Sequence, residues 1–166
     1  MRSLSQFVLI GLAAFALSAP VTGQQQRPDD QLSPRSVQLQ RDARALLAAG
    51  KLDQAEDMLE TALAVDPRNR SAFVDMARVA EKQRLYGKAI RLTNKALLIE
   101  PNDPDAIAVQ GEAMVELGAI ARAQANYAKL QTICPKGCAQ LAMLSAAISR
   151  GPAVAAAKPP VSPKSN

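Results

Sequence analysis

The chain of 166 residues contains no histidine and no tryptophan, and it has only two tyrosines, three phenylalanines and two cysteines. The absence of histidine removes the usual general base and the commonest metal ligand. The eight glycines form no phosphate-binding loop. Two cysteines and scattered carboxylates do not provide the four well-placed ligands of a structural zinc site. The composition therefore predicts neither an enzyme nor a bound cofactor.

Charge of one sign is not concentrated anywhere in the central part of the chain. The net charge of +5 comes partly from Arg2 near the N-terminus and from Lys158 and Lys164 near the C-terminus. Residues 36–150 carry 15 basic and 13 acidic side chains. A nucleic-acid-binding protein needs a concentrated basic face, so no nucleic-acid partner is expected.

Residues 1–23 have the layout of a secretory leader. Arg2 supplies the positive charge, Phe7 to Leu17 form an apolar stretch, and small residues follow up to Gly23. The stretch is short for a membrane span. We expect cleavage after Gly23, export to a compartment such as the bacterial periplasm, and no stable membrane insertion afterwards. The alternative is an uncleaved leader that anchors the protein in the membrane.

A repeat of 34 residues organises the chain after the polar linker 24–35. Pro67, Pro101 and Pro135 follow this spacing, and alanines at positions 55, 89 and 123 follow it in phase. The apolar periodicity predicts paired helices and no strands. The expected helices are 34–49, 53–65, 70–83, 86–99, 104–117 and 119–133. The pattern predicts stacked helix pairs, each ended by a proline.

Local signals support these helix boundaries. Ser33 is expected to cap the first helix through its hydroxyl, and Asp103 is expected to cap the fifth. Gly50 and Gly118 mark turns. A further amphipathic helix, 138–150, is placed to cover the last repeat. The remaining residues, 151–166, are rich in proline, alanine and lysine and are expected to be a disordered tail.

The chain resembles the tetratricopeptide repeat family over residues 36–137. Three repeats (36–69, 70–103 and 104–137) place large residues at Leu39, Phe73 and Ile107 and small ones at Ala43, Ala77 and Gly111. The small residues are expected to let the two helices of a repeat approach closely. The resemblance implies an all-α solenoid of three helix pairs with a capping helix. Asp42, Thr93, Gln110 and Leu130 depart from the family pattern.

Cys134 and Cys138 are separated by three residues at the third closing proline. Export favours a disulfide between them, which would set the angle of the capping helix. Thioredoxin-type redox proteins use two intervening residues on a strand-to-helix turn, which differs from this segment. A thiol–disulfide redox protein using Cys134 and Cys138 remains the alternative function.

The family resemblance implies a non-enzymatic scaffold that binds a protein or peptide on the face lined by the first helix of each repeat. This makes an adaptor in envelope assembly or secretion the expected function, with no prediction of oligomeric state. The charged groove residues implied by the repeat phase are Arg41, Arg44, Asp75, Arg78, Lys82, Asp105, Glu112 and Glu116. The same face includes Gln40, Leu47, Val74, Glu81, Ala108, Val109 and Val115. The residues present do not support the clamp with which some relatives bind carboxylates of chaperone C-termini.

Overall fold

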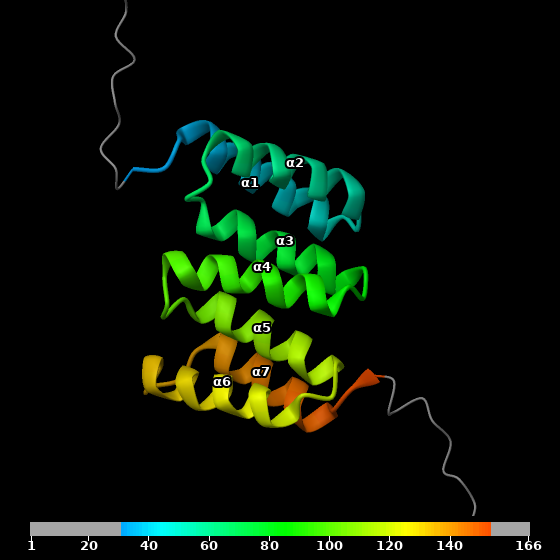
Figure 1. Cartoon of the computed structure of the whole chain (residues 1–166), viewed down its shortest axis with the longest axis vertical. Helices are drawn as coiled ribbons and strands as arrows, with labels where there is room; N and C mark the ends of the chain where they lie inside the picture. Colours follow the sequence, from blue (N-terminus) through cyan, green and yellow to red (C-terminus); the bar gives the residue numbers. More distant parts are fainter. Residues whose placement is uncertain (1–30, 154–166) are drawn as a thin grey trace, which may run out of the picture.

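The computed structural model describes residues 31–153, which form a solenoid of seven helices in three stacked layers (Figure 1). The first layer contains α1 (Pro34–Ala48) and α2 (Leu52–Val65), and the second contains α3 (Arg70–Lys82) and α4 (Tyr86–Ile99). The third contains α5 (Pro104–Glu116), α6 (Ile120–Ile133) and α7 (Ala139–Arg150). Each predicted helix boundary agrees with the structure to within one residue. The predicted leader, residues 24–30 of the linker and tail residues 154–166 lie outside the described residues.

The helix ends follow local chemistry with one exception. The side chains of Asn69 and Asp103 accept hydrogen bonds from the N–H groups of Ala72 and Ala106 and so cap α3 and α5. Ser33 occupies the cap position of α1, but its hydroxyl makes no capping bond, which corrects the expectation. Its backbone N–H instead donates to Asp66 Oδ2 at 2.8 Å, which ties the start of α1 to the end of α2.

The turn within each repeat requires a left-handed residue. Gly50 and Gly118 each have a φ of 74° at this position, and the second repeat has Arg84 there with a φ of 60°. Such a backbone conformation costs an L-residue with a side chain about 1 kcal/mol relative to glycine. The repeat therefore keeps its turn geometry even where its sequence does not favour it.

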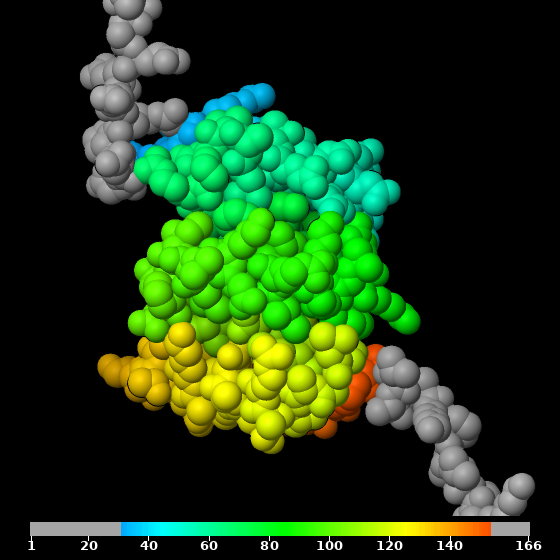
Figure 2. Space-filling view, in the orientation of Figure 1, coloured from blue at the N-terminus to red at the C-terminus, as the bar shows by residue number. Residues whose placement is uncertain are grey.

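Buried alanines allow the layers to pack closely. Ala43, Ala55, Ala77, Ala89 and Ala123 have no exposed surface. One apolar cluster joins the first two layers to α5, and two smaller clusters join α5 and α6 to Leu144 and Ala147 of α7. Helix α7 therefore covers the end of the array, as the sequence predicted. Figure 2 shows the closely stacked layers from one side.

Gly111 has a different packing partner from the one expected. A Cβ atom added at Gly111 would lie 2.6 Å from Leu144 Cδ1 and 2.7 Å from Leu144 Cδ2. The small residue thus lets α7 approach α5, instead of bringing the two helices of the third repeat together. Leu130, which replaces a small residue of the family pattern, is fully buried in the same cluster as Leu144.

Two further departures from the family pattern lie in one buried polar cluster. Gln110 Nε2 donates to Asn94 Oδ1 at 2.6 Å and to Thr93 Oγ1 at 3.4 Å. Its Oε1 accepts from Asn126 Nδ2 at 3.1 Å. Because buried polar groups need partners, these side chains replace apolar packing with mutual hydrogen bonds. Asp42, the remaining departure, is exposed within an intact α1 and accepts from Gln38.

Candidate binding groove

A groove lies across the first helices of the three repeats and the capping helix. One hollow of about 290 Å³ is lined by Leu47, Arg78, Glu81, Lys82, Val109, Glu112 and Met143. A second hollow of about 200 Å³ is lined by Glu81, Lys82, Tyr86, Glu112, Glu116 and Arg150. The two hollows share Glu81, Lys82 and Glu112, and we call the two together the groove. It combines apolar side chains with charged ones, as binding sites for polypeptide segments do.

A buried aspartate organises the basic residues beside the groove. Asp75 is fully buried on α3 and accepts hydrogen bonds from Gln40, from Arg44 Nε at 3.1 Å and from Arg78 Nη1 at 3.2 Å. Three donors from two helices thus compensate for the burial of its carboxylate. Asp75 was expected to line the groove as an exposed charge, but it acts there only through the two arginines that it positions.

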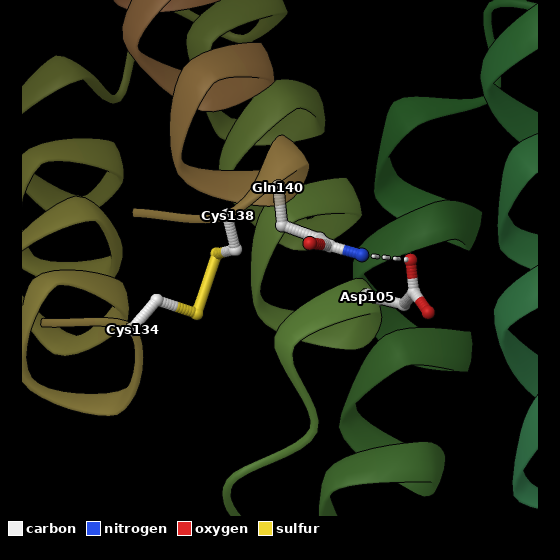
Figure 3. The surroundings of a disulfide bond; sticks show 4 residues. All are labelled: Asp105, Cys134, Cys138 and Gln140. Atoms are coloured by element: carbon white, nitrogen blue, oxygen red, sulfur yellow. Dashed lines mark hydrogen bonds between the residues drawn. A yellow bond between two sulfur atoms is a disulfide. The ribbon is translucent and has the colours of Figure 1, made fainter. Parts of the chain in front are cut away.

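The ion network continues to the capping helix through Arg78. Arg78 Nη2 donates to Asp105 Oδ1 at 2.9 Å, and Gln140 Nε2 of α7 donates to the same oxygen at 3.1 Å (Figure 3). Burial tends to raise the pKa of Asp105, but the hydrogen bond from Gln140 and the charge of Arg78 lower it below its usual value. The network links α1, α3, α5 and α7, and it engages two of the four basic residues predicted for this face, Arg44 and Arg78.

Two carboxyl groups in the groove lie outside this ion network. Glu81 and Glu112 make no ion pair with any residue between 31 and 153, and the buried Oε1 atom of Glu112 has no hydrogen-bond partner there. Burial, then the like charges of Glu112 and Glu116, raise the pKa of Glu81 to about 8 against the effect of Arg78. Burial also raises the pKa of Glu112, although Arg78 and Arg150 oppose the shift. This part of the groove is therefore suited to a cation from outside the described chain.

The structure brings together four of the predicted groove residues: Arg78, Lys82, Glu112 and Glu116. Arg44 and Asp105 flank them through the ion network, whereas Arg41 is exposed on α1 and lines neither hollow. Gln40, Val74, Ala108 and Val115 are buried and line neither hollow.

Sequence reasoning missed the contribution of α7. Met143 and Arg150 lie one 34-residue step after Val109 and Glu116, so α7 acts as the first helix of a further repeat. Extending the repeat phase past Pro135 would have found both residues.

The two cysteines form the hinge between α6 and α7. Cys134 is the C-cap residue of α6, and Cys138 is the N-cap residue of α7. A disulfide joins them, with a Cα–Cα separation of 5.8 Å (Figure 3). Gly137 between them has a φ of 87°, which favours glycine. The disulfide therefore fixes the first turn of α7, which contains Gln140. The side chain of Gln140 contacts Asp105 in the ion network.

Searches of residues 31–153 found no helix that is long and apolar enough to cross a membrane and no group of metal-ligating side chains.

Comparison with known proteins assigns the fold. A family model described as tetratricopeptide repeat matches residues 46–113. The first tetratricopeptide domain of Spaghetti (RPAP3), bound to the HSP90 peptide SRMEEVD, has 19% identity and a TM-score of 0.61, covering 69% of this chain and 94% of that one. The Sgt2 domain from Aspergillus fumigatus has 21% identity and a TM-score of 0.63, covering 81% and 91%. A search of curated proteins found no significant match.

A third solved structure is similar to the same extent. PcrH, in complex with the chaperone-binding region of PopD, has 20% identity and a TM-score of 0.61, covering 72% of this chain and 90% of that chain. Together these findings show that the chain has the tetratricopeptide repeat fold. Within residues 31–153 its fold is an all-α solenoid of three helix pairs and a capping helix. Proteins of this class are typically non-enzymatic binding scaffolds, and the similar domains above include peptide-binding ones.

Proposed function

We propose that the protein is an exported, non-enzymatic scaffold that binds an extended protein segment in the groove, as an adaptor in cell-envelope assembly or secretion. The observation that carries the proposal is that Glu81 and Glu112, which form no ion pair within residues 31–153, lie beside the apolar side chains Leu47, Val109 and Met143. Shallow apolar contact supplies affinity, while the carboxylates select the partner's charge.

The partner segment carries lysine or arginine at the position that meets these carboxylates. An ammonium or guanidinium group there would favour the ionised form of Glu81 and would give the buried oxygen of Glu112 a hydrogen-bond donor. The peptide SRMEEVD bound by the Spaghetti domain is acidic at its C-terminal end. We propose the opposite preference for this groove, because Arg44 and Arg78 are already engaged by Asp75 and Asp105.

Fluorescent peptides of matched length test this charge preference. We expect a peptide with two lysines to bind, and the same peptide with glutamates in their place to bind at least tenfold more weakly, about 1.4 kcal/mol. Glu81→Gln with Glu112→Gln should abolish the difference. Glu60→Gln on the exposed surface of α2 removes a charge outside the groove and is the control. Equal binding of both peptides to the unaltered protein would refute the proposed function.

Capture of natural partners then follows with the same variants. Reversal of Arg44 or Arg78 is a poor design because it leaves the buried Asp75 without its counter-charges. Proteins that the unaltered chain retains from the exported fraction, and that the Glu81→Gln, Glu112→Gln variant loses, are the partners the proposal requires.

The compartment and the chemical class have their own tests. The predicted leader supports export. The protein recovered from the exported fraction should have the mass of a chain that begins at Gln24. Retention of residues 1–23 would instead support the membrane-anchored alternative.

Titration of free thiols tests the thiol–disulfide alternative, since a structural disulfide resists mild reductant. Unchanged peptide binding after Cys134→Ser with Cys138→Ser would argue against redox chemistry.

A further inference from the structure

The chain returns to the groove after the capping helix ends. Helix α7 ends at Arg150, and Gly151 then adopts a φ of 71° that turns the backbone. The N–H of Ala153 donates to Glu116 Oε2 at 3.0 Å, and Arg150 lies 3.7 Å from the other oxygen of Glu116. Because Glu116 lines the groove, the following residues leave the described part of the chain at the groove's edge.

The sequence that follows has a charge opposite to that of ionised Glu81 and Glu112. Residues 154–166 contain Lys158 and Lys164 and no acidic side chain, and prolines stand at positions 159, 160 and 163. Proline-rich sequence favours the extended polyproline conformation, which advances about 3.1 Å per residue and loses little entropy on binding.

The distances allow Lys158 to reach the carboxyl groups of Glu81 and Glu112. Lys158 is the fifth residue after Ala153, which corresponds to about 16 Å of extended chain. Glu112 lies four residues before Glu116 on α5, or about 6 Å along the helix axis. Glu81 lines the same hollow as Glu112 and Glu116. The tail therefore has enough length and some slack.

The other cations that line the groove leave this position open. Arg78 is bound to Asp75 and Asp105, and Arg150 is paired with Glu116. Lys82 is exposed and forms no ion pair with Glu81 or Glu112 within residues 31–153. A lysine that arrives from beyond Ala153 would be the first to engage both glutamates.

We propose that residues 154–164 of the same chain fold back into the groove, with the Lys158 ammonium between the carboxylates of Glu81 and Glu112. This inference rests on the proposed function in that the tail occupies the site of the partner segment. Because the tail is tethered, its effective concentration at the groove reaches the millimolar range, and even a weak contact competes with a free partner. The tail thus sets a threshold of affinity that a partner must exceed.

The test measures competition between the tail in place and a free lysine peptide. The full chain without its leader is titrated with the fluorescent two-lysine peptide described above, alongside Lys158→Ala and the control Lys136→Ala, which removes an exposed charge from the cysteine loop. If the tail fills the groove nine-tenths of the time, Lys158→Ala raises the apparent affinity about tenfold. Lys136→Ala leaves it unchanged.

Backbone amide signals provide a readout that needs no ligand. The signals of Glu81 and Glu112 should shift on Lys158→Ala and should shift in the same direction when the chain is ended after Ala153. They should also be independent of protein concentration. Shifts that grow with concentration would assign the tail to a second copy and overturn the intramolecular arrangement.

The two proposals fail in distinguishable ways. Equal peptide affinity of the unaltered chain and Lys158→Ala, with binding still lost on Glu81→Gln and Glu112→Gln, overturns the tail proposal alone. If no lysine peptide binds any variant, including the chain ended after Ala153, the proposed charge preference is wrong and the tail proposal falls with it.

Discussion

The contact between Gly111 and Leu144 determines whether the capping helix can dock against α5. We predict that Gly111→Ala destabilises the protein when Leu144 is present and stabilises it when Leu144 is shortened. In Gly111→Ala, the new methyl group would lie 2.6 Å from Leu144 Cδ1, and Leu144 is fully buried. Overpacking of this kind costs about 1–3 kcal/mol, whereas alanine gains about 1 kcal/mol over glycine in a helix interior. The free energy of unfolding should therefore decrease by up to about 2 kcal/mol.

Shortening Leu144 removes the obstruction. Leu144→Ala alone should cost about 2–5 kcal/mol because it leaves a cavity beneath α7. In that background the three atoms nearest to the methyl group of Gly111→Ala are gone, so its helix propensity dominates and the second substitution should stabilise the protein by up to about 1 kcal/mol. The cycle of four proteins isolates the contact, with a coupling energy of about 1–3 kcal/mol.

Urea unfolding followed by circular dichroism measures all four proteins. Gly87→Ala on α4 is the matched control, because the nearest atom to its added Cβ is the flexible end of Arg91 at 3.7 Å. That substitution should be neutral or stabilising. If Gly111→Ala destabilised the protein equally with Leu144 and with alanine at 144, the close approach of α5 and α7 would not be the cause.

Three further predictions concern single residues. Arg84→Gly should stabilise the protein by about 1 kcal/mol in thermal unfolding, because it relieves the left-handed backbone at φ 60°; a loss of stability would show that the arginine side chain compensates for the strain. Asp75→Ala should cost about 2–3 kcal/mol, since Arg44 and Arg78 lose a buried acceptor; a value near zero would make the network a surface feature. Glu81 carries a proton in the folded protein up to a pKa of about 8 but loses it near 4.5 when unfolded, so stability should fall as pH rises between these values. Glu81→Gln should remove most of this pH dependence, measured by urea unfolding. The free energy of unfolding should rise by about 1–3 kcal/mol above pH 8, after allowance for solvent screening, and should be unchanged below pH 4.5. An equal change in the free energy of unfolding at all pH values would contradict the assignment.

The sequence by itself determined the helices and the way they repeat. Helix ends depend on local groups, such as the caps at Asn69 and Asp103 and the closing prolines, so a 34-residue phase places them to within one residue. The same phase placed a small residue at Gly111. The turn at Arg84 shows the limit of local reading, because its side chain gives no sign of the left-handed backbone that the repeat imposes.

The tertiary structure alone decided which charges in the groove remain available. Gln40, Arg44 and Arg78 converge on Asp75 because α1 and α3 pack in one particular register, and this contact turns an expected surface charge into a buried one. Glu81 and Glu112 come close enough to repel each other, and neither forms an ion pair within residues 31–153, for the same reason. Burial and charge pairing depend on distances between helices, which the repeat phase does not specify. The sequence thus predicted a solenoid of helix pairs, and only the packing of its layers determined which charged side chains pair with one another.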